Sequence, residues 1–416
     1  MGRPTHFECA TCAAVVDIST PFPFSCPNAT ADDRRHVLQI RDVADGHRDV
    51  DLQEQTFVAH DEQLAWAAYA DANGVRRERR DELVRALDAA IQAVDGVGFQ
   101  PTPLMRSQVL SDELGMSAGG GVWVKDETGA VGGSQKARHL FSILLHLRAA
   151  EEIGHLADRP RLAISSCGNA ALAAAMLAKA ASWPIDVFVP TWMSDGFGRL
   201  LDELDATVHR CERRDDDPPG DPAMLRFRDA VRSGAVPFTV QGPENALCLD
   251  GGRTIGWEIA DQAAALDCRL DRIFVQVGGG AFAATVGASL DVPLYAVQTE
   301  GCAPLDRAWR RSVDIEHPAS QWSELMTVWD DPTSLADGIL DDETYDWIGV
   351  IEAMRRRGGR PVVAPETCVV EAHRLAHAAG YDASATGSAG LAGLLHVRDE
   401  IRPTEQIAII ISGVSR

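Results

Sequence analysis

Residues 122–144 read V-W-V-K-D-E-T-G-A-V-G-G-S-Q-K-A-R-H-L-F-S-I-L, and this stretch decides what the rest of the chain has to build. Its beginning, at 121–124, is apolar and predicts a short buried strand. A loop rich in glycine follows, and leucine and isoleucine then recur at the spacing of a helix that ends near 153. Ser134 and Lys136 lie where the loop enters this helix.

Lysine is nearly absent from this chain, which makes the lysine of the loop a candidate for chemistry. Lys125, Lys136 and Lys179 are the three lysines of the sequence, and arginine supplies the remaining basic side chains. Arginine stays protonated, whereas a lysine with a lowered pKa can attack a carbonyl carbon and form an imine. The alternative is that Lys136 is a solvated residue in the first turn of a helix.

The composition is that of a globular protein with room for two or three domains, since 45% of the 416 residues are hydrophobic. No apolar run approaches the ~20 residues that cross a bilayer, and the first residues do not resemble a signal peptide. A net charge of −22 argues against general nucleic-acid binding. The cysteines number nine, an odd count, and most have apolar neighbours, so we expect a reduced, cytoplasmic protein.

The first 60 residues differ from the rest because they hold three of the cysteines. Cys9 and Cys12 have the spacing of a zinc knuckle, and Cys26 follows them. A structural zinc site needs four ligands, and Ala29 stands where a fourth cysteine would fall. A metal site and a metal-free set of cysteines are both open interpretations, and we favour the metal-free one. The residues able to complete a site are His6 and His36.

After two expected helices at 61–72 and 79–94, strands and helices alternate along the chain. This alternation indicates parallel α/β layers that are buried on both faces. We expect two doubly wound α/β domains with mostly parallel sheets, preceded by an N-terminal extension at 1–95. The large domain would comprise 96–130 and 245–416, and a small mobile domain, 131–244, would carry Lys136. The expected strands are 162–165, 185–189, 238–240, 273–277, 294–298 and 407–411, and the expected helices 168–181, 194–204, 252–266, 283–289, 368–379 and 388–398.

Three turns that contain glycine each follow an expected strand and open an expected helix. The first holds Lys136, the second is S-S-C-G-N at 165–169, and the third is G-G-G-A at 278–281. Helix N-termini attract anions because they present free N–H groups and the positive end of the helix dipole. Glycine also lets backbone amides approach a phosphate closely. The third turn therefore predicts a phosphate site, and the second predicts a carboxylate site.

The main alternative for the third turn is a dinucleotide site. The spacing G-x-G-x-x-G is absent, because Ala283 stands where the third glycine would be, and no Walker sequence occurs. A phosphate site, an imine-forming lysine and a carboxylate site together point instead to pyridoxal 5′-phosphate (PLP) acting on an amino acid.

Over residues 96–416 the chain resembles the fold type II PLP enzymes, the group around tryptophan synthase β, cysteine synthase, threonine dehydratase and threonine synthase. G-S-Q-K-A-R at 133–138 resembles the lysine motif of that group, and S-S-C-G-N-A at 165–170 resembles its S-x-G-N loop. V-G-G-G-A at 277–281 resembles its glycine loop. The remaining matches are P-T-P-L at 101–104, V-W-V-K-D-E at 122–127 and I-S-G at 411–413.

The resemblance implies a role for each of these turns. Lys136 would bind PLP covalently and move the Cα proton, and Ser412 would meet the ring nitrogen. A neutral hydroxyl there does not enforce ring protonation, which favours elimination and replacement over transamination. The implied cofactor-binding residues are Lys136, Asn169, Gly278, Gly279, Gly280, Ala281 and Ser412. The implied substrate-binding residues are Ser134, Ser165, Ser166 and Gly168.

Within this group, several features favour threonine synthase. The N-terminal cysteine segment and D-G-G-R-T-I-G-W-E-I at 250–259 resemble that branch, and S-L-A-D-G-I at 334–339 is shared with the dehydratases. Three departures stand against it: A-V-G-G-S replaces the usual N-P-T-G-S at 130–134, Gln135 replaces an aromatic residue or histidine, and the fourth cysteine is missing.

The sequence therefore predicts a PLP-dependent lyase that works at Cβ or Cγ of an amino acid, on O-phosphohomoserine or a related substrate. The alternatives are a serine/threonine ammonia-lyase, a β-replacement enzyme similar to cysteine synthase, and a non-catalytic binding protein with the same fold. We expect a homodimer that binds a small amino acid and neither nucleic acid nor membrane.

Overall fold

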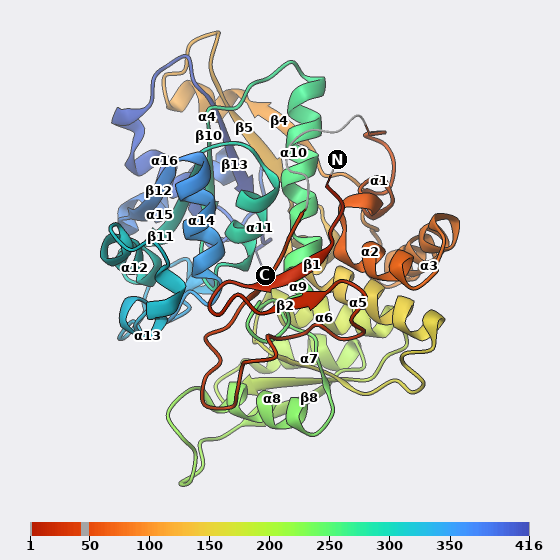
Figure 1. Ribbon diagram of the computed structural model, residues 1–416. Coiled ribbons are helices and arrows are strands. Elements are labelled where there is room, and N and C mark those ends of the chain that lie inside the picture. The colour runs from red at the N-terminus through yellow and green to blue at the C-terminus, as the bar shows by residue number, and fades with distance from the viewer. Residues whose placement is uncertain (1, 43–49, 416) are drawn as a thin grey trace.

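The computed structural model describes residues 2–42 and 50–415, and Figure 1 shows their arrangement. The described strands form three sheets, with the orders β2-β1-β3, β12-β11-β10-β13-β5-β4 and β8-β7-β6-β9. Helices alternate with the strands of the last two sheets along the chain. These strands run parallel except for β4, which pairs antiparallel with β5, so the predicted α/β class is confirmed. None of the helices in the described ranges is long and apolar enough to cross a membrane.

The six-stranded sheet is wound on both faces. Along β10, Ile273 and Val275 belong to the core that contains α11 and α14, whereas Phe274 between them belongs to the core of α15 and α16. Alternate side chains of a strand point to opposite faces, so this division places one helix layer on each side of the sheet. The strands are β4 (Leu104–Ser107), β5 (Gly121–Asp126), β10 (Arg272–Gln276), β11 (Leu294–Thr299), β12 (Gly359–Ala364) and β13 (Gln406–Ile411). Its helices are α4 (Gln108–Glu113), α10 (Arg253–Ala265), α11 (Ala281–Ser289), α12 (Pro304–Ser312), α13 (Trp322–Leu325), α14 (Trp347–Arg357), α15 (Glu366–Ala378) and α16 (Ala389–His396).

The four-stranded sheet lies inside the range assigned to the small domain and occupies the lower part of Figure 1. The strand expected at 238–240 is wrong in position, because the pairing with β6 occurs at Val236 and Pro237. The strands are β6 (Leu162–Ser165), β7 (Ile185–Pro190), β8 (Thr207–Cys211) and β9 (Val236–Pro237). The helices are α5 (Lys136–Ile153), α6 (Asn169–Ala180), α7 (Asp195–Glu203) and α8 (Pro222–Arg232).

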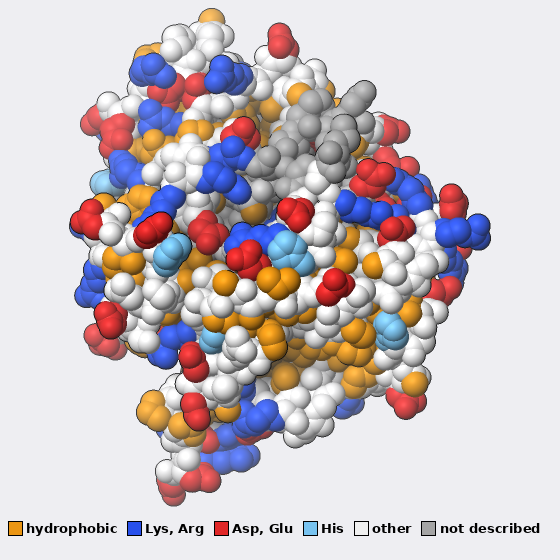
Figure 2. Space-filling model, viewed as in Figure 1, with side chains coloured by type: hydrophobic (Ala, Val, Ile, Leu, Met, Phe, Trp, Pro, Cys, Tyr) orange, Lys and Arg blue, Asp and Glu red, His pale blue; other side chains and the backbone are white. Residues whose placement is uncertain are grey.

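The N-terminal extension holds a small antiparallel sheet and a short helix, α1, that the sequence did not predict, followed by the two helices that it did, α2 and α3. The strands are β1 (His6–Cys9), β2 (Val15–Asp17) and β3 (Leu38–Ile40). The helices are α1 (Thr56–Ala59), α2 (Ala65–Ala72) and α3 (Arg77–Asp95), and α9 (Cys248–Gly251) lies between the two large sheets in sequence. In Figure 2 acidic and basic side chains are interspersed over this face of the molecule, in keeping with surface ion pairs such as Arg79–Glu152 at 2.9 Å.

Candidate active site

The lysine singled out by the sequence is the first residue of α5. Gly132 and Gly133 before it have φ values of 67° and 65°, a conformation that glycine adopts without a steric cost. Lys136 keeps some solvent exposure, yet it lies deep in the protein, and burial lowers the pKa of its amine. The carboxylates of Asp341 and Asp346 oppose this effect. A lowered pKa increases the neutral fraction, which is the form that attacks a carbonyl.

The C-terminal strand brings Ser412 to the lysine turn. Gln135 donates its backbone N–H to Ser412 Oγ at 3.0 Å, and Val414 donates its N–H to the carbonyl of Gly133 at 3.1 Å. Asn169, the first residue of α6, is also close, since a Cβ added to Gly413 would lie 3.3 Å from its Nδ2. The structure therefore brings together three predicted cofactor-binding positions that lie far apart in the sequence.

The glycine turn connects β10 to α11, which Ala281 begins. The backbone N–H of Gly279 donates to the carboxyl of Asp341, so this turn already faces an anionic oxygen. A Cβ on Gly278 would lie 2.4 Å from Asp341 Oδ2, and one on Gly280 would lie 2.8 Å from Thr344. The turn thus has an amide directed at an oxygen and no space for side chains, which are the properties expected of a phosphate site.

Two acids beside the lysine, the buried Asp346 and the half-buried Asp341, were not predicted. Asp346 Oδ2 accepts the N–H of Gly242 at 3.0 Å, while its Oδ1 has no hydrogen-bond partner among the described residues. Burial raises the pKa of Asp346 to about 7, against the effects of Gly242 N–H and Lys136. Burial also raises the pKa of Asp341, which Lys136 opposes. Both belong to the acidic segment 340–346, which directly follows S-L-A-D-G-I and was open to interpretation as a surface loop.

The predicted carboxylate site is a polar turn at the start of α6. Ser165 ends β6, and Ser166 Oγ accepts the backbone N–H of Gly168 at 3.3 Å, within the turn itself. Gly168 is the N-cap of the helix that Asn169 begins, so the turn adjoins the site through Asn169. Ser134, the remaining predicted substrate-binding residue, is buried, and its Oγ has no partner among the described residues.

Several motif residues build a buried cluster of charges rather than the site itself. Arg138 donates from Nε to Glu127 Oε2 at 2.9 Å and from Nη1 to Glu258 Oε1 at 2.6 Å. Lys125 donates to Glu258 Oε2 at 2.6 Å, and the backbone N–H of Thr102 donates to the same oxygen at 3.2 Å. This cluster joins β5, α5 and α10, so it fixes the first turn of the helix that Lys136 begins.

The residues at this site fit PLP. Ser134 Oγ and Gln135 Oε1 are buried polar atoms without partners among the described residues at the lysine turn, and the glycine turn holds an acidic oxygen where a phosphate would bind. The hydroxyl of Ser412 accepts the backbone N–H of Gln135, the residue directly before Lys136.

A family model described as pyridoxal-phosphate dependent enzyme matches residues 97–413. This chain belongs to that family. PLP is therefore the cofactor of the enzyme, and the predicted resemblance to fold type II PLP enzymes is confirmed at that level. A search of curated proteins finds no match to the chain.

Solved structures of PLP enzymes share this fold at low sequence identity. A threonine deaminase from T.th. is 20% identical with a TM-score of 0.62, and the match covers 80% of this chain and 98% of that one. Diaminopropionate ammonia lyase from Escherichia coli is 16% identical with a TM-score of 0.63, covering 81% and 89%. Maize serine racemase is 17% identical with a TM-score of 0.62, covering 80% and 93%.

Proposed function

We propose that this PLP enzyme is an ammonia-lyase that removes a β substituent from a small amino acid and releases ammonia and a 2-oxo acid. The observation that carries the proposal is the acidic surroundings of Lys136. Asp341 and Asp346 lie close enough to affect its amine, and both have raised pKa values. The names of similar structures, which include threonine deaminase and diaminopropionate ammonia lyase, support the same class.

The charge of this site indicates which leaving groups suit it. A phosphate leaving group is a dianion, and enzymes bind it with arginine, lysine or a metal. Asp341, Cys248 and Asp346 act electrostatically on Lys136, and none of these three side chains carries a positive charge. Two carboxyl groups suit a hydroxyl or an amine, which leaves after it gains a proton.

Each residue of the site then has a defined task in this proposal. PLP, when bound, supplies the electron sink that makes the Cα proton acidic. Lys136 removes that proton, and the turn of Ser165, Ser166 and Gly168 binds the substrate carboxylate. Asp346, with a pKa of about 7, is a neutral acid in a large fraction of molecules and donates a proton to the leaving group. The departing group takes the bonding electron pair from Cβ, and water later releases ammonia from Cα.

A threonine synthase-like reaction is the competing proposal, and the motif at 250–259 and the N-terminal cysteine segment support it. It differs in one product, because elimination from O-phosphohomoserine releases inorganic phosphate. It also differs in what the site has to hold, since this substrate carries a phosphate into a site with two carboxyl groups.

One panel of substrates separates the two reactions. The PLP-loaded enzyme is incubated with serine, threonine, 2,3-diaminopropionate and O-phosphohomoserine, and ammonia, 2-oxo acid and phosphate are measured. We expect ammonia and 2-oxo acid from at least one of the first three, in equal amounts from serine or threonine and in a 2:1 ratio from 2,3-diaminopropionate, and no phosphate. Phosphate release from O-phosphohomoserine with threonine as product would refute the ammonia-lyase and support the alternative. The Lys136→Arg variant is the control, since it keeps the charge without the imine-forming amine.

A further inference from the structure

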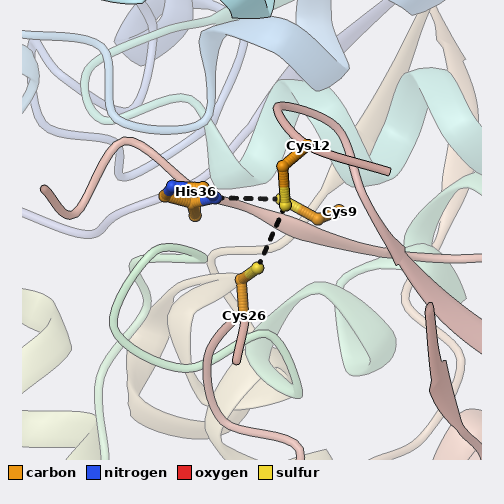
Figure 3. Close-up of side chains that lie close together, drawn as sticks. All are labelled: Cys9, Cys12, Cys26 and His36. Carbon is orange, nitrogen blue, oxygen red and sulfur yellow. Dashed lines mark hydrogen bonds between the residues drawn. The ribbon is translucent and has the colours of Figure 1, made fainter. Parts of the chain in front are cut away.

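Four potential metal ligands meet in the N-terminal extension, outside the PLP site. One ligand atom from each of Cys9, Cys12, Cys26 and His36 lies within 4.8 Å of all the others, as Figure 3 shows. Cys9 Sγ is 3.4 Å from His36 Nδ1, and Cys12 Sγ is 3.5 Å from Cys26 Sγ. Ligands of a tetrahedral zinc ion with ordinary bond lengths lie about 3.3 to 3.8 Å apart. We propose that these residues bind one Zn²⁺ as a structural site.

The proposal replaces the metal-free interpretation that the sequence favoured. The sequence left His6 and His36 open as the fourth ligand, and the structure places His36 at the cysteines. His36 reaches them because β3, directly after it, pairs with β1, the strand that ends at Cys9. His6, the other candidate, lies instead next to Thr5 Oγ1, at 2.8 Å from its Nδ1.

The surroundings of the cluster match those of a metal site. Asp33 Oδ2 lies 3.6 Å from His36 Nε2, on the side of the ring opposite Cys9. A carboxylate in this position orients a metal-binding histidine and leaves the other nitrogen for the metal. Asn28 donates its backbone N–H to Cys26 Sγ at 3.4 Å and its side-chain N–H to Cys12 Sγ at 3.3 Å. Such N–H donors stabilise thiolates, the form of cysteine that binds metals.

The turn after Cys12 is strained in a way that a metal would offset. Ala13 has a φ of 54°, a conformation that costs energy for any residue with a Cβ. Its N–H donates to the carbonyl of Cys9 at 2.9 Å, which closes the C-x-x-C loop. The surrounding sheet has strands of three or four residues, too small to form a large apolar core by itself. Small units of this kind commonly depend on a metal.

The ligand set identifies the ion class and its role. Three thiolates and one imidazole in a tetrahedral arrangement suit zinc, and four protein ligands leave no open position for catalysis. The segment between the ligands binds the body of the enzyme: His146 of α5 donates to the carbonyl of Pro21 at 2.6 Å, and Ala246 donates its N–H to the carbonyl of Phe24 at 2.7 Å. The metal therefore holds the extension against the helix that Lys136 begins.

The full-length, PLP-loaded enzyme provides the test. We expect about one zinc per chain by elemental mass spectrometry, and X-ray absorption at the zinc edge should show three sulfur ligands and one nitrogen ligand. Cys12→Ser and His36→Ala should each lower the zinc content at least ten-fold after dialysis against a weak chelator. Cys368→Ser, which changes a half-buried cysteine of α15, should keep the wild-type content.

Other outcomes would overturn the proposal. Absence of metal after expression in zinc-supplemented medium, or a Cys12–Cys26 disulfide in freshly purified protein, would show that the cluster is not a zinc site. Zinc coordinated only by oxygen and nitrogen would place it elsewhere. If a variant does not fold, the absorption spectrum of the wild-type enzyme still decides, because it reads the ligands without mutation. These measurements do not depend on which amino acid the enzyme uses.

Discussion

Lys136 differs from the other lysines in its surroundings. Lys125 is fully buried and bound to Glu258, and Lys179 donates to the carbonyl of Glu203 at 2.7 Å on the surface of α6. We therefore predict that Lys136→Ala abolishes turnover and covalent PLP attachment while the far-UV spectrum stays unchanged. Borohydride reduction followed by peptide mass spectrometry is the measurement. Labelling of a peptide that lacks Lys136 would refute the assignment.

The raised pKa of Asp346 gives a pH prediction. If this carboxyl protonates the leaving group, kcat should fall as the pH rises through about 7, where Asp346 loses its proton. Asp346→Asn should lower kcat by about 10²–10⁴-fold and remove that dependence on pH. Asp342→Asn, which changes the exposed acid nearby, is the control. An unchanged pH profile in Asp346→Asn would show that another group limits the rate.

The same residue predicts a pH dependence of stability, with the sign set by the raised pKa. The folded state holds the proton of Asp346 up to about pH 7, whereas the unfolded chain loses it near pH 4. The contribution of Asp346 to the free energy of unfolding of the wild type is thus fully present below about pH 4, and it is lost as the pH rises through about 7. Across that window, the free energy of unfolding of Asp346→Asn should rise relative to that of the wild type by about 4 kcal/mol, as measured by urea denaturation.

Residues of the site were predictable where a local pattern defines them. Lys136, Asn169 and the glycines each follow a predicted strand, and turns at strand ends meet at one edge of a sheet. Asp341 and Asp346 were not predictable, because an acidic segment has the composition of a surface loop. Their burial arises from packing against Gly278, Gly279 and Gly242, which is a tertiary property.

At the scale of elements, the cluster of buried charges holds β5, α5 and α10 together. Glu258 of α10 accepts from Lys125 of β5, from Arg138 of α5 and from Thr56 at 2.6 Å in each case. Arg138 and Lys125 hold the pKa of Glu258 far below its usual range, although burial opposes them. Removing one member of such a cluster leaves an uncompensated buried charge.

Glu258→Gln should therefore lower the free energy of unfolding by about 3–5 kcal/mol, as measured by guanidinium denaturation. Its matched control is Glu371→Gln, which breaks an exposed pair with Arg374 at 2.7 Å and should lower stability far less. A similarly small loss in both variants would show that the cluster does not fix α5.

Elements with apolar runs were predicted almost to the residue, and those at sheet edges were missed. β6 was predicted with its observed bounds, and β13 within one residue. β12 contains Pro361, which argues against a central strand, and it is indeed at the edge of its sheet, where proline is tolerated. β8 is a polar strand and also lies at the edge of its sheet. Neither its hydrophobic pattern nor its residue propensities identify it as a strand.

At the scale of the whole molecule, the site joins two sheets that belong to different parts of the sequence. The S-S-C-G-N turn follows a strand of the four-stranded sheet, whereas the lysine turn, the glycine turn and Ser412 follow strands of the six-stranded one. Ligands of open α/β sheets bind at the carboxyl ends of strands. We propose that the part of the chain at 131–244 moves as a small domain and closes over the substrate.

Closure would depend on the substrate carboxylate, which the turn of Ser166 binds in this proposal. Because that hydroxyl contacts substrate and not PLP, Ser166→Ala should leave the PLP absorbance unchanged and raise KM by about ten-fold, the effect of losing one hydrogen bond to a charged group. Substrate should slow hydrogen exchange at 162–190 in the wild-type enzyme and do so less in the variant. Ser233→Ala, on the exposed end of α8, should match the wild type in both measurements. Loss of PLP from Ser166→Ala, with KM unchanged, would place this hydroxyl in the cofactor site and leave closure to other residues.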